Sequence, residues 1–498
     1  MNEAIAMKRN ICLILLLGVL CTSCKDFLTL VPKGSKVVTT VEDVKSELVG
    51  YWSACSYYRT PVLSYGTASN LSLPFYNDVN THLAIYSDDM DMLMFNRHQD
   101  ISSKVMGYYY QDVEWKGLTL ASAMWSASYC SIGFMNAIID DLSGMKPTQE
   151  ERETILDEAR LIRAWCLLKL IQFFAPYHND ALGVPLNLSS SDTEPHPRSS
   201  QTELYAFIEK EVEDVLSYQA SPQQWNIFYR KRFMNSMLAD MYLFKAGSAA
   251  AASDDYEKAE LYSSRALSGY DLEENATILA RLFTKDAFDI SPDNNYCAVR
   301  MVSSRSNGIG AQYTGIWGKD NAQQPVAELL NLYANNDIRR QAWFVDGEDE
   351  GVPVVYIAKP RYESDEMGDL TLIYRTAEMY LINCEAKCRQ GKTEEAAKLL
   401  RSFREKRIEG YQDPIDTDVL QEVLKERRRE LCFENGLRWL DMKRLGLTCS
   451  RRGYSDEQTD MATYTLEADD YRYALPIPTD IEIDYNNIDQ NPGWTTFE

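Results

Sequence analysis

A chain of 498 residues is long enough to bury a large core, either as one large domain or as two to three ordinary ones. With 45% hydrophobic and 25% charged residues it has the composition of a globular protein, which excludes both a disordered chain and a polytopic membrane protein. The formal net charge of −23, from 51 basic and 74 acidic residues, excludes nucleic acid as a partner because its phosphates would be repelled.

The first 23 residues have the pattern of a secretory signal peptide. Lys8 and Arg9 precede the apolar run from Ile11 to Leu20, which is too short for a mature transmembrane helix. Small Ser23 stands directly before Cys24, an arrangement that resembles the lipobox of bacterial lipoproteins. In such proteins the cysteine becomes the acylated amino terminus, so residues 1–23 would be removed.

Cys24 is preferred over Cys21 as the lipidation site because bulky Leu20 would otherwise precede the cleaved bond. Each buried methylene contributes about 0.8 kcal/mol, so several acyl chains would attach the protein stably to a membrane. The alternative is an ordinary secretory signal with incidental cysteines. No later apolar run has membrane length, so we expect residues 24–498 to form a single body that is tethered to the membrane and not embedded in it.

The body is predicted to be all-α, that is, mostly α-helical. Apolar residues recur at helical spacing in five segments of its first half. These predicted helices are Val41 to Tyr58, Ser122 to Leu142, Gln149 to Phe174, Thr202 to Tyr218 and Arg230 to Lys245.

Two long stretches interrupt this pattern. Residues 60–117 and 271–360 are rich in Gly, Pro, Asn and Ser with interspersed aromatic residues, and we expect long irregular loops with short helices only around Ser87 to Phe95. Loops of this length in a compact body are usually functional, so they are expected to carry the ligand site.

Pairs of helices that look like tetratricopeptide units are expected mainly within residues 150–270 and 370–445. Such pairs need small residues where two helices cross closely. In the clearer pair, a helix from Leu370 to Arg389 is followed by Gly391 and then by Ala396 on the second helix. Any helical hairpin can produce one pair with this spacing, so the repeat is a hypothesis.

Two further segments close the chain. Val419 to Leu445 carries alternating basic and acidic residues, which favour a salt-bridged helix over an anion-binding site. The prolines of the tail, residues 473–498, forbid a continuous helix, so we expect the tail to be extended and to wrap back over the body.

Eight of the 11 cysteines remain once the signal peptide and the acylated residue are set aside, and they are scattered. Cys384 and Cys388 lie four apart on one helical face. They allow a metal or redox interpretation, but packing is favoured because no second cysteine pair and no nearby histidine completes a tetrahedral site.

An ordered set of motifs resembles the SusD/RagB family of nutrient-binding outer-membrane lipoproteins. The matching segments are Cys24 to Leu28, Tyr86 to Asp89, Glu158 to Trp165, Gly183 to Leu186, Arg375 to Leu381, Glu426 to Arg444, Leu475 to Pro478 and Gln490 to Trp494. The resemblance implies a helical body built around tetratricopeptide units. It also implies a lipid-anchored protein on the exterior of the outer membrane, which binds a nutrient oligomer, usually a glycan, for a SusC-like TonB-dependent transporter.

Sugar rings offer apolar faces flanked by hydroxyls, so a glycan site needs aromatic platforms and polar side chains. The resemblance carries over only the region of Asp88 and Asp89 and the aromatic residues of the loops. The full set of candidates is Asp88, Asp89, Asn96, Arg97, Trp115, Tyr296, Tyr313 and Trp317. Trp125, Trp165 and Trp439 lie on periodic helices, where a core position is favoured.

Catalysis is not expected, and neither a cofactor nor a metal is predicted. The chain has no zinc-binding His-Glu-x-x-His spacing and no Gly-x-Ser-x-Gly nucleophile elbow. A lipid-anchored glycoside hydrolase is one alternative, because two carboxylates at catalytic separation cannot be recognised from sequence. A purely protein-binding helical-repeat scaffold is the other.

Overall fold

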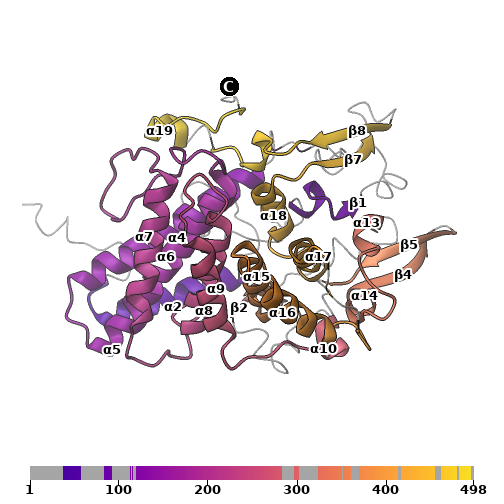
Figure 1. Cartoon of the computed structure of the whole chain (residues 1–498). Helices are drawn as coiled ribbons and strands as arrows, with labels where there is room; N and C mark the ends of the chain where they lie inside the picture. The colour runs from indigo at the N-terminus through magenta and orange to yellow at the C-terminus, as the bar shows by residue number, and fades with distance from the viewer. Residues whose placement is uncertain are drawn as a thin grey trace, which may run out of the picture.

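Helices make up most of the described structure of this computed structural model (Figure 1). The described residues are 38–57, 83–91, 113, 115, 119–282, 297–301, 324–349, 351–359, 369–412, 415, 417–454, 461–478 and 482–494. The longer helices are α2 (Val41–Tyr57), α4 (Thr119–Ser143), α6 (Asp157–Phe174), α7 (Gln201–Leu216), α8 (Lys231–Lys245), α9 (Asp255–Leu267), α15 (Thr376–Arg389), α16 (Thr393–Glu405), α17 (Val419–Leu431) and α18 (Leu437–Leu445). The mostly helical fold class is confirmed.

Helix α6 is the central helix of the first half of the chain. It continues from α5 (Gln149–Glu151) through a π-helical turn, Arg152–Leu156, and the run begins at a capping box between Thr148 and Glu151. Nearly every residue of α6 is buried. Because it is covered by α4 on one side and α7 on another, α6 forms the core against which both pack.

Five helices pack in succession in the middle of the molecule. Helix α9 lies between α8 and α15, and α15 in turn contacts both α16 and α17 (Figure 1). Small residues at the crossings, among them Ala259, Ala266 and Ala396, are fully buried. The expected close helix pairs are present, while their assignment as tetratricopeptide units stays a prediction.

The strands form four antiparallel pairs among the described residues. The pairs are β1 (Met90–Asp91) with β3 (Gln324–Pro325), β2 (Cys297–Met301) with β6 (Asp369–Tyr374), β4 (Phe344–Asp349) with β5 (Val352–Ile357), and β7 (Cys449–Tyr454) with β8 (Met461–Leu466). The β4–β5 and β7–β8 hairpins lie at the edge of the helical body, whereas β2 lies in its middle, below α9 and α15 (Figure 1).

The observed strands and short helices correct three expectations from the sequence. The helix predicted from Leu370 begins only at Thr376, because the preceding residues pair with β2. The short helix predicted around Ser87 to Phe95 is wrong at β1, where the chain is extended. The stretch 271–360 is not irregular throughout, since it contains the β4–β5 hairpin and the short helices α10 (Ala276–Ala280), α13 (Ala327–Leu330) and α14 (Ile338–Trp343). Short apolar runs do not distinguish strand from helix by periodicity alone.

The helix predicted from Val419 to Leu445 is two helices. Between α17 and α18 the backbone turns sharply, and Phe433, Asn435 and Gly436 have φ angles of 63°, 45° and 64°. Left-handed residues end a right-handed helix, so α18 leaves in a new direction.

The C-terminal tail packs over the end of α6, and it is not extended throughout, since it contains the short helix α19 (Asp484–Asn486). The backbone N–H of Leu475 donates to the carbonyl of Phe173 over 2.9 Å. The Asn491 side chain donates to the carbonyl of Phe174 over 2.6 Å. These bonds satisfy carbonyl groups at a helix end that would otherwise lack partners. Among the described residues, none of the helices has both the length and the apolar character needed to cross a membrane.

Candidate ligand-binding site

Asp88 and Asp89 are held by two arginines from distant helices. The Arg438 guanidinium of α18 donates two bonds of 2.6 Å to the Asp88 carboxylate, one to each oxygen. Arg428 of α17 donates from Nε to Asp89 over 2.8 Å. Paired bonds from one guanidinium are strong and fix orientation. These pairs therefore fasten residues 83–91 to the C-terminal helices.

The pKa values of the two carboxyl groups shift in opposite directions. Burial alone would raise the pKa of Asp88, but the positive charges of Arg438 and Arg428 outweigh it, and the pKa falls below its usual range. For Asp89 burial prevails over Arg428, and the pKa rises. Asp89 is completely buried, so its prediction as a ligand contact is corrected. The Asp88 side chain retains 25% exposure and stays a candidate.

Trp115 is a core residue. It is only 1% exposed. Its ring meets Tyr86 edge to face at 5.0 Å and Trp439 at 5.9 Å between centroids. A buried indole has no free face for a sugar, so the prediction of Trp115 as a stacking platform is wrong. The core positions predicted for Trp125, Trp165 and Trp439 are confirmed.

The remaining predicted site residues lie outside the described residues. They are Asn96, Arg97, Tyr296, Tyr313 and Trp317, together with the lipidation site Cys24. Their assignments stay predictions.

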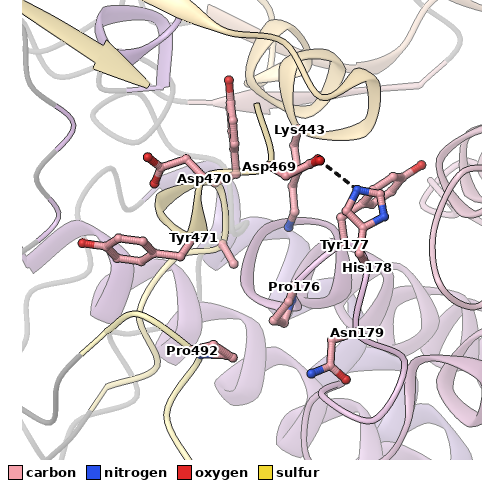
Figure 2. Close-up of a pocket in the computed structure, with 11 residues that line it drawn as sticks. Pro176, Tyr177, His178, Asn179, Lys443, Asp469, Asp470, Tyr471 and Pro492 are labelled. Carbon is pink, nitrogen blue, oxygen red and sulfur yellow. Dashed lines mark hydrogen bonds and ion pairs between the residues drawn. The ribbon is translucent and has the colours of Figure 1, made fainter. Parts of the chain in front are cut away.

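A pocket that the sequence did not predict opens beside the tail (Figure 2). It has a volume of about 240 Å³. Its walls come from residues 176–179 after α6, from Lys443 of α18, from residues 469–471, 473 and 474, and from Pro492, and we call it the tail pocket. The tail packs across the end of α6, which brings these segments together.

Polar side chains of the tail pocket already have partners within the protein. His178 Nε2 lies 2.9 Å from Asp469 Oδ1, and both side chains are about half exposed (Figure 2). Lys443 is buried, and its Nζ donates to the carbonyls of Gln172 over 2.8 Å and Ala175 over 2.6 Å. Burial lowers the pKa of Lys443 to about 7, because it disfavours the charged ammonium.

Aromatic and proline side chains supply apolar wall in the tail pocket. Tyr177 and Tyr473 are buried, and their hydroxyls donate to the carbonyls of Phe244 and Leu447, both over 2.7 Å. Tyr471 is 45% exposed. No sequence signal identifies this pocket, because its walls are separated by almost 300 residues and no local period links them.

The cysteines do not mark a chemical site in the described structure. Cys384 is fully buried among Ala396, Leu400 and Val423, and burial raises the pKa of its thiol well above the usual range. No group of histidine, cysteine and acidic residues suited to a metal ion occurs among the described residues. The packing interpretation of Cys384 agrees with its position.

Two family models match separate parts of the chain. The model described as the SusD family matches residues 355–494. The model described as "Starch-binding associating with outer membrane" matches residues 70–243. Comparison with curated protein sequences found no match.

Several solved structures share this fold. A SusD superfamily protein from Bacteroides thetaiotaomicron is 23% identical, with 91% of this chain and 100% of that chain covered and a TM-score of 0.68. A SusD-like carbohydrate binding protein from Bacteroides vulgatus is 19% identical, with coverages of 90% and 97% and a TM-score of 0.67. A putative sugar binding protein from the same species is 20% identical, with coverages of 93% and 100% and a TM-score of 0.70.

Proposed function

We propose, from the premise that this chain belongs to the SusD/RagB family, that it binds a nutrient oligosaccharide at the cell surface and passes it to a transporter. Relatives described as starch-binding and carbohydrate-binding support the ligand class. The net charge of −23 favours a neutral glycan over an acidic one, because like charges repel.

One observation carries this proposal: the two matched segments form one continuous body. Lys443 and Leu475, from the C-terminal match, bond to the carbonyls of Gln172 and Phe173, from the N-terminal match. Arg438 from the C-terminal match also holds Asp88 from the N-terminal one. The two segments that match the family models therefore belong to one helical frame, which supports the proposal.

We further infer that the mature protein is anchored in the outer membrane through acyl chains on Cys24, with its body facing the exterior. The signal-like first 23 residues and the family description that mentions the outer membrane support this location. A SusC-like TonB-dependent transporter would be the partner that receives the ligand. Helices α8, α9, α15 and α16 would offer it a surface, since packed helix pairs commonly bind proteins.

The ligand would be bound without being changed. Glu430 and Arg339, two described residues with strongly shifted pKa values, form a buried ion pair away from the tail pocket. Lys443, whose pKa burial lowers to about 7, lines the pocket, but its Nζ is directed to two backbone carbonyls. These residues stabilise the frame, and nothing marks them as an acid and base pair open to substrate.

The test is a binding screen of residues 25–498 against neutral and acidic oligosaccharides of plant, host and microbial origin. We expect retention of at least one neutral oligosaccharide, recovered intact by mass spectrometry. Trp317→Ala should weaken its binding roughly two- to tenfold, since an aromatic contact is worth about 0.5 to 1.5 kcal/mol. Hydrolysis of the oligosaccharide, or the absence of binding across the panel, would contradict the proposal.

The anchor is tested separately by labelling cells with a clickable palmitate analogue. We expect label on the full chain and none on Cys24→Ala, with the wild-type protein in the outer-membrane fraction. Label that persists in Cys24→Ala would assign acylation to another residue.

A further inference from the structure

Three arginines from the C-terminal part of the chain bond to residues 85–89. Arg451 of β7 donates from Nη1 to the carbonyl of Ser87 over 3.2 Å. Arg428 of α17 donates from Nη2 to the carbonyl of Asp88 over 2.5 Å. The third arginine is the one on α18 that donates to both oxygens of the Asp88 carboxylate. We call Arg428, Arg438 and Arg451 the arginine clamp.

The segment held by the arginine clamp leads directly into the pairing of β1 with β3. The two strands are antiparallel, and the backbone N–H of Val326 donates to the carbonyl of Asp89 over 3.0 Å. Strand β1 belongs to the stretch 60–117 and β3 to the stretch 271–360, the two stretches predicted to carry ligand. The structure therefore joins these stretches to each other at the point where the clamp holds the first of them.

The start of α18 also holds the far side of residues 92–112, which lie outside the described residues and include two of the predicted ligand contacts. Before this interval, Asp88 bonds to Arg438. After it, the ring of Trp115 meets that of Trp439 edge to face, with 5.9 Å between centroids. Two adjacent residues of α18 therefore anchor the described residues on both sides of the interval.

Arg438 controls the direction of the Asp88 carboxylate as well as its position. Each carboxylate oxygen accepts one bond of 2.6 Å from the same guanidinium, and such a paired arrangement fixes orientation. The Asp88 side chain is 25% exposed and that of Arg438 only 12%, so the arginine supports the carboxylate from the interior side. A lysine ammonium is a point charge and cannot reproduce the fork.

We propose that Arg438 is a positioning residue for ligand binding, which acts through Asp88 to hold the stretches 60–117 and 271–360 in one arrangement. The inference rests on the proposed function, because these stretches are the ones predicted to contact the oligosaccharide. In this role Arg438 affects affinity without contacting the ligand. A site that is already arranged binds more tightly, since less conformational entropy is lost on binding.

Calorimetric titration of Arg438→Lys with the most tightly retained oligosaccharide of the screen tests the effect on affinity. The variant keeps the positive charge and loses the paired bonds. We expect it to bind roughly three- to tenfold more weakly than wild type. Thermal melting followed by circular dichroism confirms that it is folded. If it is not, Arg438→Gln replaces it, since the planar amide keeps a donor.

Arg444→Lys is the matched control. Arg444 lies on the same helix and also donates paired bonds to a buried carboxylate, both of 2.7 Å, but its partner Glu385 is in α15 and outside both stretches. Its loss of the fork should lower the melting temperature, as in Arg438→Lys, while the affinity stays that of wild type. A merely structural role of Arg438 would give the two variants the same affinity.

A double-mutant cycle with Asp88→Asn tests whether Arg438 acts through Asp88. If it does, adding Arg438→Lys to Asp88→Asn weakens binding no further, because the partner that transmits the effect is already gone. Effects of the two substitutions that multiply would show that Arg438 acts by another route.

Hydrogen exchange followed by mass spectrometry tests the arrangement without any ligand. The peptide that contains Val326 should exchange roughly three- to tenfold faster in Arg438→Lys than in wild type, because the bond from Val326 to Asp89 opens more often. The same peptide should exchange at the wild-type rate in Arg444→Lys.

Three results would overturn the positioning role: wild-type affinity in folded Arg438→Lys, an equal loss of affinity in Arg444→Lys, or unchanged exchange of the Val326 peptide in Arg438→Lys. Retention of an oligosaccharide with an affinity independent of Arg438 removes the positioning role alone. No retention, with faster exchange of the Val326 peptide only in Arg438→Lys, contradicts the proposed function and supports the hold of Arg438 on the two stretches.

Discussion

At the scale of single residues, a buried carboxylate can join segments that are distant in the sequence. Glu158 of α6 is fully buried and accepts hydrogen bonds from the backbone N–H groups of Ile227 and Phe228, at 2.9 and 3.0 Å. It also accepts from the indole of Trp52 in α2 over 3.1 Å. One side chain therefore satisfies donors from a loop and from a helix, each distant in sequence.

We predict that Glu158→Ala lowers the free energy of unfolding by roughly 3 to 5 kcal/mol, because it leaves several buried donors without an acceptor. Urea denaturation followed by tryptophan fluorescence measures this. Glu42→Gln is the control, since the Glu42 side chain is 73% exposed and should change stability by less than about 0.5 kcal/mol. Equal midpoints for Glu158→Ala and wild type would refute the role given to Glu158.

Glu378 provides a pH test. Burial, reinforced by the charge of Asp240, raises its pKa from 4.5 to about 8. Between these pH values the unfolded chain releases the proton while the folded chain keeps it, so this group lowers stability as pH rises through the window. The contribution of Glu378 to the free energy of unfolding falls by up to about 1.4 kcal/mol for each pH unit.

We therefore expect Glu378→Gln to flatten the pH dependence of unfolding between pH 5 and 8, since glutamine does not titrate. Urea midpoints at three pH values within this window give the slope. The variant should gain stability relative to wild type as the pH rises. Parallel slopes for the two proteins would show that Glu378 is ionised in the fold.

At the scale of elements, the junction between α17 and α18 depends on one glycine. Gly436 has a φ of 64°, and a Cβ there would lie 2.5 Å from Leu83 Cδ1 and 3.3 Å from the Phe173 ring. The left-handed backbone and the close packing both exclude a side chain. This turn directs α18 so that Arg438 reaches Asp88 and Lys443 reaches the end of α6.

Gly436→Ala is predicted to destabilise the protein by roughly 2 to 4 kcal/mol, through backbone strain and overpacking. The contrasting change is Gly50→Ala within α2, where nothing lies within 4 Å of the added Cβ. That change should stabilise by about 0.5 to 1 kcal/mol, since alanine favours a helix interior. The same sign for both variants in thermal melts would be inconsistent with this account.

At the scale of the whole molecule, α17 is joined to its surroundings by buried ion pairs. Glu426 and Glu430 are fully buried and form ion pairs with Arg339 of α14, at 2.7 and 2.9 Å. Arg375 before α15 and Arg407 after α16 also bond to Glu430. The salt-bridged character predicted for this helix is confirmed, but its principal partners come from other elements.

Glu430→Gln should therefore lower the free energy of unfolding by about 3 to 5 kcal/mol, because it removes the negative charge that compensates the buried guanidinium groups. Burial would raise the pKa of Glu430, but Arg407, Arg375 and Arg339 lower it far below its usual range. A lowered folded-state pKa gives stability that is present above the unfolded value of 4.5 and lost as pH falls below it. Acid titration monitored by circular dichroism should show Glu430→Gln unfolding at higher pH than wild type. Glu422→Gln, at a partly exposed position of the same helix, is the control and should shift the transition little.

The sequence alone determined those features of the fold that depend on residues close together in the chain. Helical periodicity predicted α4, the continuous run from α5 to α6, α7 and α8 to within a few residues. Local signals begin two of them, namely the capping boxes at Thr148 and Ser200. The prolines of the tail excluded a continuous helix there, and within its described residues from 474 onward the only named helix is the short α19 (Asp484–Asn486). These features follow from interactions within one turn of the chain, which a sequence records directly.

Only the tertiary structure determined which segments and side chains contact one another. Leu370 to Tyr374 became a strand because β2, some 70 residues earlier, pairs with it. Trp115 was placed in the core by Tyr86 and Trp439. The tail pocket exists only because the tail packs across the end of α6. Each of these outcomes depends on long-range packing, where the free energy is set by which surfaces meet, and no local pattern specifies that choice.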